Sequence, residues 1–294
     1  MGELREGLAD STVVGRGGVI QAVQHVRRMR GGAQSHLMRA NDGFFYVVKF
    51  QNNPQHRRVL ANELLATRLA LDIGLTMAPA EIVLVDSWLV RNTPDLTIQL
   101  AGHSLPCEPG MQFGSRYVVD PMAEAAQVLD FLPETMSDRV KNLAEFAGVL
   151  AFDKWTCNAN GRQAMYWKQA RDKKYTVTFI DQGYCFNAGE WTFPDAPLRG
   201  VYARNHVYTG ITGWDSFEPW LTRIEQMSES TIGALADTVP VEWYGDMDEM
   251  ARLVEELFRR RTGVRELIEA FRTSSREPFP NWRERTPVPY GSGT

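Results

Sequence analysis

Residues 152–158 read FDKWTCN, and residues 180–183, at the end of an apolar run, read IDQG. The first stretch closes a helical pattern at Asp153 and carries Asn158 five positions later. The second places Asp181 directly after a run rich in β-branched and aromatic residues, which is typical of a strand. The order of Asp153, Asn158 and Asp181 along the chain says more about the fold than their residue types do.

Asp and Asn side chains in this order are the groups that phosphoryl transfer from ATP requires. Kinases place an Asp that orients the attacking hydroxyl five positions before an Asn that binds Mg²⁺, and a second metal-binding Asp further along. Both side chains supply the oxygen ligands that Mg²⁺ prefers. The Asp–Asn spacing alone arises by chance in many chains. Two predicted strands, 163–168 and 175–180, between Asn158 and Asp181 make the pattern more specific.

The N-terminal half supplies matching groups. Residues 36–40 and 44–50 flank an Asn-Asp-Gly turn and predict a β-hairpin, with Lys49 late in its second strand. A helical pattern follows over 57–73, with Leu60, Leu64, Thr67 and Leu71 on one face. Glu63 lies beside that face. A half-buried Glu needs a partner, and Lys49 is the nearest candidate in the predicted topology.

The rest of the chain divides into a strand-rich and a helix-rich half. Further strands are expected at 81–85, 88–90 (as a hairpin with 81–85) and 113–119, with mostly loop over 91–110; helices are expected at 122–132, 138–152, 228–238, 247–260 and 264–271. This order predicts an α+β fold of two lobes, a small β-rich N-terminal lobe with one helix and a larger, mainly helical C-terminal lobe. We expect the lobes at 1–119 and 120–273, and an extended tail over 274–294.

Composition narrows the functional classes. The 294 residues carry a formal charge of −4, so the basic surplus typical of nucleic-acid binding is missing and no direct nucleic-acid contact is expected. No apolar run approaches the roughly 20 residues that span a bilayer, so no membrane association is expected. The first residues do not resemble a secretory signal, and the three cysteines show no metal or disulfide spacing. A cytoplasmic location is the expectation.

Several short motifs together resemble the HipA-like kinases, bacterial Ser/Thr kinases related in fold to eukaryotic protein kinases and phosphoinositide kinases. They are GAQ at 32–34, NE at 62–63, FDKW at 152–155, NGRQ at 160–163 and IDQGYCF at 180–186. The last three resemble the compact HipA-like domain proteins most. The resemblance covers about residues 30 to 220 and implies a two-lobed, protein-kinase-like fold.

The resemblance implies a role for each matched residue. A phosphate-covering loop would consist of Gly31, Gly32, Ala33, Gln34 and Ser35. Lys49 would bind the phosphates of ATP, with Glu63 orienting it. Adenine would lie near Val118, Val119 and Asp120.

The C-terminal lobe would carry the chemistry. Asp153 would be the catalytic base, and Asn158 and Asp181 would hold Mg²⁺. Lys154 resembles the Arg that follows the catalytic Asp in phosphoinositide kinases, and would stabilise charge in the transition state. The cofactors implied are ATP and Mg²⁺.

The sequence does not identify the acceptor of the phosphate or the partners of the protein. The leading hypothesis is an ATP-dependent kinase that phosphorylates a Ser or Thr hydroxyl of a protein. Alternatives are a kinase with a small-molecule hydroxyl acceptor, a pseudokinase that binds ATP without catalysis, and a transferase of AMP. The resemblance to toxin–antitoxin kinases also allows an antitoxin-like inhibitor protein.

Overall fold

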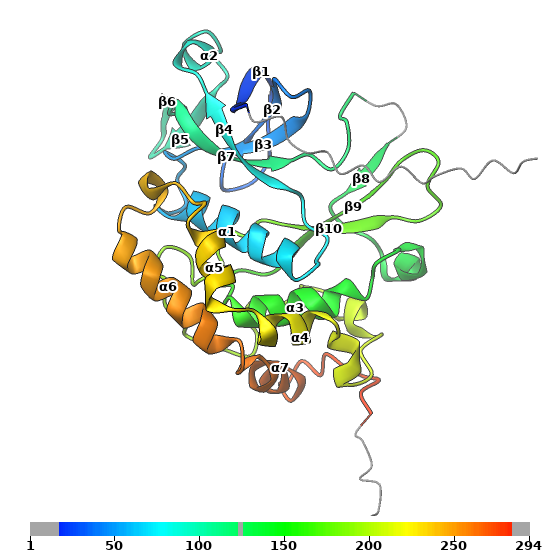
Figure 1. The fold of residues 1–294 in the computed structure, drawn as a ribbon. Helices are drawn as coiled ribbons and strands as arrows, with labels where there is room; N and C mark the ends of the chain where they lie inside the picture. Colours follow the sequence, from blue (N-terminus) through cyan, green and yellow to red (C-terminus); the bar gives the residue numbers. More distant parts are fainter. Residues whose placement is uncertain (1–17, 123–125, 284–294) are drawn as a thin grey trace, which may run out of the picture.

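Strands from the first part of the chain close into a five-stranded barrel in the order β1-β2-β3-β7-β4 (Figure 1). The structure is a computed structural model and describes residues 18–122 and 126–283. The barrel strands are β1 (Ile20–Arg28), β2 (His36–Ala40), β3 (Phe45–Lys49), β4 (Ala80–Val85) and β7 (Gly110–Arg116). All neighbouring strands are antiparallel except β1 and β4, whose parallel pairing closes the barrel.

The hairpin expected from the Asn-Asp-Gly turn is confirmed. Strands β2 and β3 pair from His36 opposite Val48 to Arg39 opposite Phe45. Gly43 has a φ of +88°, which a residue without a Cβ adopts at no steric cost. The Asp42 carboxylate accepts a hydrogen bond of 3.0 Å from the Phe44 backbone N–H. The turn thereby sets the register that puts Lys49 at the end of β3.

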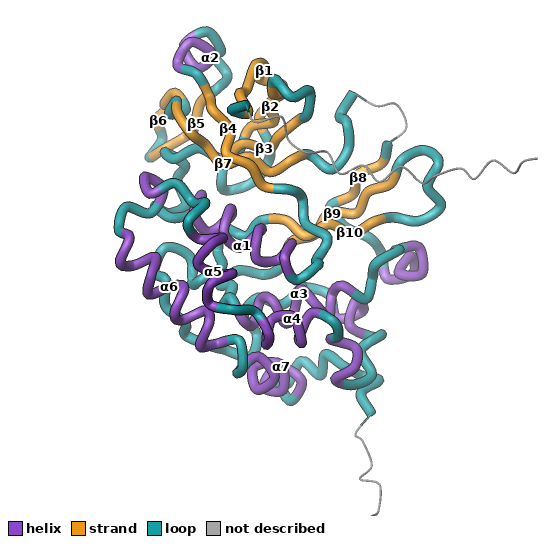
Figure 2. Tube along the Cα trace, in the orientation of Figure 1, coloured by secondary structure: helices purple, strands orange, loops and turns teal. Residues whose placement is uncertain are grey.

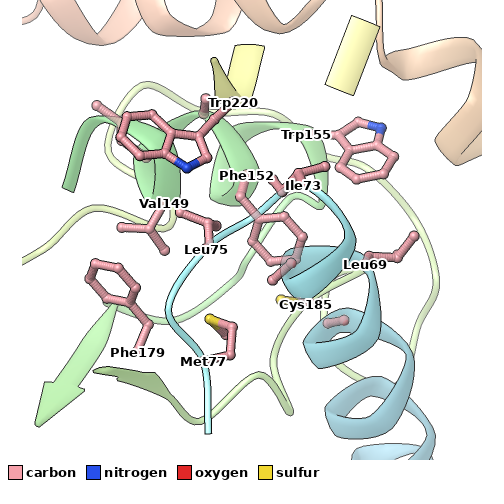
Figure 3. Close-up of a cluster of buried hydrophobic side chains, with 14 of the residues drawn as sticks. Leu69, Ile73, Leu75, Met77, Val149, Phe152, Trp155, Phe179, Cys185 and Trp220 are labelled. Atoms are coloured by element: carbon pink, nitrogen blue, oxygen red, sulfur yellow. The ribbon is translucent and has the colours of Figure 1, made fainter. Parts of the chain in front are cut away.

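Helix α1 (Val59–Asp72) lies between the barrel and the C-terminal helices (Figure 1). It is buried on nearly all sides, and its side chains share one core with those of α3 (Glu145–Trp155). Figure 3 shows Leu69 and Ile73 facing this core together with Phe152 and Trp155. Of the face expected from the sequence, only Leu71 is exposed, at 39%. Because α1 is packed on nearly every side, it lies in the core and joins the two lobes.

The C-terminal lobe combines a small sheet with a helical layer (Figure 2). Its sheet has the order β10-β9-β8, from β8 (Gln127–Leu129), β9 (Gln163–Lys168) and β10 (Thr176–Ile180). The helices that follow are α4 (Trp220–Gln226), α5 (Glu229–Ala236), α6 (Met247–Arg260) and α7 (Val264–Arg272). Short 3₁₀ turns occur at Glu134–Arg139, Asn205–Tyr208, Trp214–Phe217 and Val241–Trp243. The hairpin predicted before Asp181 and the last three predicted helices are confirmed within three residues at each end.

Next to the barrel, one expected strand is wrong and one hairpin was not expected. Residues 88–90 belong to a short helix, α2 (Ser87–Arg91), because the Asp86 carboxylate accepts a hydrogen bond of 2.6 Å from the Trp88 N–H and caps it. The stretch 91–110 contains the hairpin of β5 (Thr97–Leu100) and β6 (His103–Pro106). Its turn residues Ala101 and Gly102 both have positive φ, as a two-residue hairpin turn requires.

Two helix expectations are wrong or too long. Where a helix was expected at 122–132, residues 127–129 form the edge strand β8, paired with β9; residues 123–125 lie outside the described residues. Pairing in the sheet outweighs local helical pattern here. The helix expected from 138 begins at Glu145, after a 3₁₀ turn and an irregular stretch.

The fold is α+β, with a β-rich N-terminal part and a mainly helical C-terminal part. Residues 274–283, expected within an extended tail, pack onto the helical part. The Phe279 ring is buried and lies within 6.0 Å of the rings of Tyr208, Phe217 and Phe271. Among the residues that the structure describes, no helix is both long and apolar enough to cross a membrane.

Candidate active site

A cavity of about 300 Å³ lies between the barrel and the β9–β10 hairpin, a volume typical of small-ligand sites. Its lining has an apolar and a polar part. The apolar part includes Val47, Ala78, Phe113, Val118, Met165 and Ile180. The polar part includes Ser35, Lys49, Gln55, Glu63, Asn160, Gln163, Asp181 and Tyr184. The cavity therefore suits a ligand with an apolar portion and a charged portion.

A three-residue ion cluster forms the charged wall of this cavity. The ammonium of Lys49, at the end of β3, pairs with Glu63 of α1 and lies 2.8 Å from Oδ1 of Asp181. The second oxygen of Glu63 accepts a hydrogen bond of 2.9 Å from the backbone N–H of Gln182. Lys49 and Asp181, which are 132 positions apart in the sequence, are thus in direct contact. The expected Lys–Glu partnership is present, and Asp181 shares it.

Burial and mutual charge shift the proton affinities within this cluster. Burial alone would lower the pKa of Lys49, but the charges of Glu63 and Asp181 outweigh it and raise that pKa. Burial raises the pKa of Glu63, and the negative charge of Asp181 adds to this shift, while Lys49 acts in the opposite direction. Burial also opposes ionisation of Asp181, yet Lys49 and Arg162 hold its pKa below the ordinary value. Asp181 is therefore an anion facing the cavity, suited to a cation.

The glycine-rich loop contributes most of its expected residues to the cavity. Gly31, Gly32, Ala33 and Ser35 line it. Gln34 does not, since its side chain turns to β5, where it donates to the Gln99 carbonyl at 2.8 Å and accepts from the Gln99 N–H at 2.7 Å. The structure thus assigns Gln34 to anchoring the loop.

The segment expected to contact adenine divides between two depressions. Val118 lines the cavity, next to Tyr117. Val119 and Asp120 line a neighbouring depression together with Trp167. Of the three, only Val118 can contact a ligand in the cavity.

Asp153 and Asn158 lie behind the cavity and do not line it. Asp153 is fully buried, and the guanidinium of Arg162 holds both of its carboxylate oxygens, with Nε 2.9 Å from Oδ2 and Nη2 bonded to Oδ1. The Asn158 amide donates to Asp153 Oδ1 at 2.9 Å, and its Oδ1 accepts from the Asn160 N–H at 3.1 Å. The backbone of Gly200 covers this group so closely that a Cβ there would lie 2.6 Å from Asp153 Cβ.

Two functional candidates lie in the NGRQ motif at 160–163, but the sequence analysis assigned them no role. Gln163 donates from Nε2 to Oδ2 of Asp181 at 2.6 Å, and it lines the cavity together with Met165. The period of two between Gln163 and Met165 in a predicted strand is the signal that could have indicated Gln163. The motif also contains Arg162, but no local signal indicates its role, because its partner Asp153 belongs to another element.

Lys154 faces away from the cavity. Its ammonium donates to the carbonyls of Pro197 and Arg199, both at 2.7 Å, and it is absent from the cavity lining. Burial lowers its pKa to about 8, although Asp153 and Asp195 act in the opposite direction. A neutral amine still has two protons for the two carbonyls.

A pH-dependent contribution to stability follows for Lys154. Because its pKa is lower in the folded chain than its ordinary 10.5, unfolding takes up a proton between about pH 8 and 10.5, so raising the pH in this range stabilises the fold. Compared with Lys154→Met, the wild type should gain about 2 kcal/mol of unfolding free energy between about pH 7.5 and 9.5. Urea unfolding at both pH values measures this, and parallel changes in both proteins would contradict it.

Solved kinase structures share this architecture. The Helicobacter pylori proinflammatory kinase CtkA is similar with a TM-score of 0.53 and 12% identity, over 85% of this chain and 99% of that one. Fam20 of hydra, solved with sugar, gives 0.53 and 11%, over 90% and 89%. The Golgi casein kinase gives 0.50 and 13%, over 87% and 74%. The fold is thus that of protein-kinase-like proteins.

A family comparison narrows this class. The model of the HipA-like kinase family matches residues 22–268, and the chain belongs to this family. A search of curated proteins found no match. Family and fold together identify a kinase-fold phosphotransferase, which agrees with the resemblance seen in the motifs.

Proposed function

We propose that the protein is an ATP- and Mg²⁺-dependent kinase that phosphorylates a Ser or Thr hydroxyl of a protein. The observation that carries this is the Lys49 ammonium held between Glu63 and Asp181 on a cavity that the glycine-rich loop also lines. In this proposal Lys49 binds the α- and β-phosphates, and Glu63 orients it. The loop residues 31–33 and Ser35 cover the phosphates, and Val118 contacts the base.

The two side chains proposed as metal ligands carry oxygens that suit Mg²⁺, although only Asp181 lines the cavity. Asp181 and Asn158 offer carboxylate and amide oxygens, the hard ligands that Mg²⁺ prefers. Within the described ranges, no three His, Cys, Asp or Glu side chains form a metal cluster. Mg²⁺ commonly binds one or two protein oxygens and takes its other ligands from phosphates and water. When bound, it would neutralise charge on the phosphates; Gln163 and Asn160, which hydrogen-bond the two ligands, would then have to release them.

Asp153 is the proposed base, and its burial constrains when it can act. Its carboxylate is occupied by Arg162 and Asn158, and Gly200 lies against it. Because Asp153 has no exposed surface, a hydroxyl can reach it only after some of the groups packed around it move. This burial also favours a second candidate function, a nucleotide-binding module without transfer.

Isotope transfer from ATP distinguishes the candidates. The wild type with Mg²⁺ should move label from γ-labelled ATP, and not from α-labelled ATP, to itself or to a protein in a cell extract. Lys49→Met should lower this transfer by on the order of 10²–10³, because the charge that meets the phosphates is lost. Lys141→Met removes an exposed lysine whose partner is Asp172, and should leave transfer unchanged.

Each of the other outcomes of this experiment would support a different function. Label from α-labelled ATP would indicate AMP transfer. Nucleotide binding without any labelled protein would leave a small-molecule acceptor, detected as ADP release with metabolites, or the binding module. An absence of nucleotide binding would contradict the kinase proposal. An antitoxin-like inhibitor protein stays a prediction from the resemblance.

A further inference from the structure

Arg162 is a buried arginine whose guanidinium joins two loops. It lies between Asn160 and the start of β9, and its side chain is wholly inside the protein. Toward α3 it forms the fork with Asp153 described above. Such a two-point contact fixes direction as well as distance, which a lysine cannot do. Asp153 in turn holds the amide of Asn158 at 2.9 Å.

The other edge of the same guanidinium holds the loop of Asp181. Nη1 donates to the backbone carbonyl of Ile180 at 3.0 Å and to the side-chain oxygen of Gln182. These residues are the immediate neighbours of Asp181 on both sides. Asp181 has a φ of +63°, a conformation that the surrounding contacts must maintain. One side chain therefore reaches the neighbours of Asp181 and, through Asp153, Asn158.

We propose that Arg162 is a positioning residue that sets the spacing of Asn158 and Asp181 and so tunes the site for a divalent cation. The inference rests on the proposed function, which names these two side chains as the metal ligands. Arg162 lies outside the cavity lining, so it acts through its partners and not on a ligand. Its loss should weaken the effect of Mg²⁺ on nucleotide binding more than nucleotide binding itself.

Arg260 provides a matched control in the same lobe. It is also buried, and its guanidinium forms a two-point contact with Asp195, at 2.7 and 2.8 Å. It donates to the backbone carbonyls of Lys154 and Trp155, at 3.0 and 2.9 Å. Arg260 therefore resembles Arg162 in burial and in bonding, but none of its hydrogen bonds among the described residues reaches the Asp181 loop or Asn158.

The test measures ADP affinity by calorimetry, once with saturating Mg²⁺ and once with EDTA. The ratio of the two dissociation constants gives the enhancement by Mg²⁺. In Arg162→Lys and Arg162→Met, we expect this enhancement to fall by about tenfold or more, while affinity in EDTA changes less than about threefold. Arg260→Met should keep the wild-type enhancement. Arg162→Lys retains the buried positive charge, so it serves if Arg162→Met does not fold.

Thermal unfolding of each variant, without nucleotide, verifies that binding is measured on folded protein. The proposal is overturned if Arg162→Lys keeps the full enhancement, or if Arg260→Met loses as much of it as the Arg162 variants. A wild type that binds ADP equally with Mg²⁺ and with EDTA would instead overturn the proposed function, and the role of Arg162 with it. The effect of Mg²⁺ on ADP binding by the wild type therefore distinguishes a failure of the proposed function from a failure of the role of Arg162.

Discussion

Asp181→Asn is expected to lower the rate of phosphoryl transfer by on the order of 10³. The change keeps the size of the side chain and suits the positive φ of this position, since Asn adopts it readily. It removes the carboxylate that Lys49 and Arg162 keep ionised, so the proposed metal ligand becomes a neutral amide. Transfer of label from γ-labelled ATP, followed over time, measures the loss.

The effect of Asp181→Asn should be separable from a loss of folding. Affinity for nucleotide in EDTA should change little, because Lys49 and the loop remain. Asp172→Asn, on the exposed β9–β10 turn, is the matched control and should transfer phosphate like the wild type. Full activity of Asp181→Asn would contradict the assignment of Asp181 as a metal ligand.

The ion pair of Asp153 and Arg162 should show strong coupling in stability. Each side chain is buried, so removing one leaves the other charge without its partner. Arg162→Met and Asp153→Leu are each expected to lower the unfolding free energy by about 3–5 kcal/mol. The loss of unfolding free energy in the double variant should be about 3 kcal/mol smaller than the sum of the two single losses, because no uncompensated charge remains. Urea unfolding of the four proteins measures the coupling.

An exposed pair provides the contrast for this cycle. Lys141 and Asp172 lie 3.6 Å apart at the surface, and solvent screens their interaction. Their single and double variants should therefore be additive within the scatter of the measurement. Additive effects for Asp153 and Arg162 as well would mean that the buried contact carries no coupling. In that case the guanidinium would not link the two loops energetically.

Most of the helices and strands that carry the expected site residues were predictable, because each rests on a local signal. The Asn-Asp-Gly turn predicts the hairpin that carries Lys49, and a helical pattern carries Glu63 after it. Asp153 follows a helical pattern directly, in a helix that continues to Trp155, and Asp181 follows a β-rich run. Turn-forming residues and the periodicity of apolar side chains are signals that span only a few residues, so a single sequence is enough to recognise them.

Most of the failed expectations concern residues whose structure depends on a distant contact. The apolar residues at 127–129 pair with β9 instead of forming a helix. The short helix after Asp86 is the exception, because its cap is a local contact. Gln34 and Lys154 lie in the motifs that predicted them as site residues, yet their side chains bond to Gln99 and to the carbonyls near Arg199. Sequence spacing predicts which helix or strand carries a residue, but it does not predict which group the side chain contacts.

The sequence by itself therefore determined a two-lobed α+β kinase fold and the order of Lys49, Glu63, Asp153, Asn158 and Asp181 along it. Only the tertiary structure decided that the first two share their contact with Asp181, and that Asp153 is closed off by Arg162 and Gly200. The physical reason is that buried charges must be compensated by whatever lies beside them after packing. Those neighbours come from segments up to 132 residues apart, a distance at which no local pattern specifies a partner.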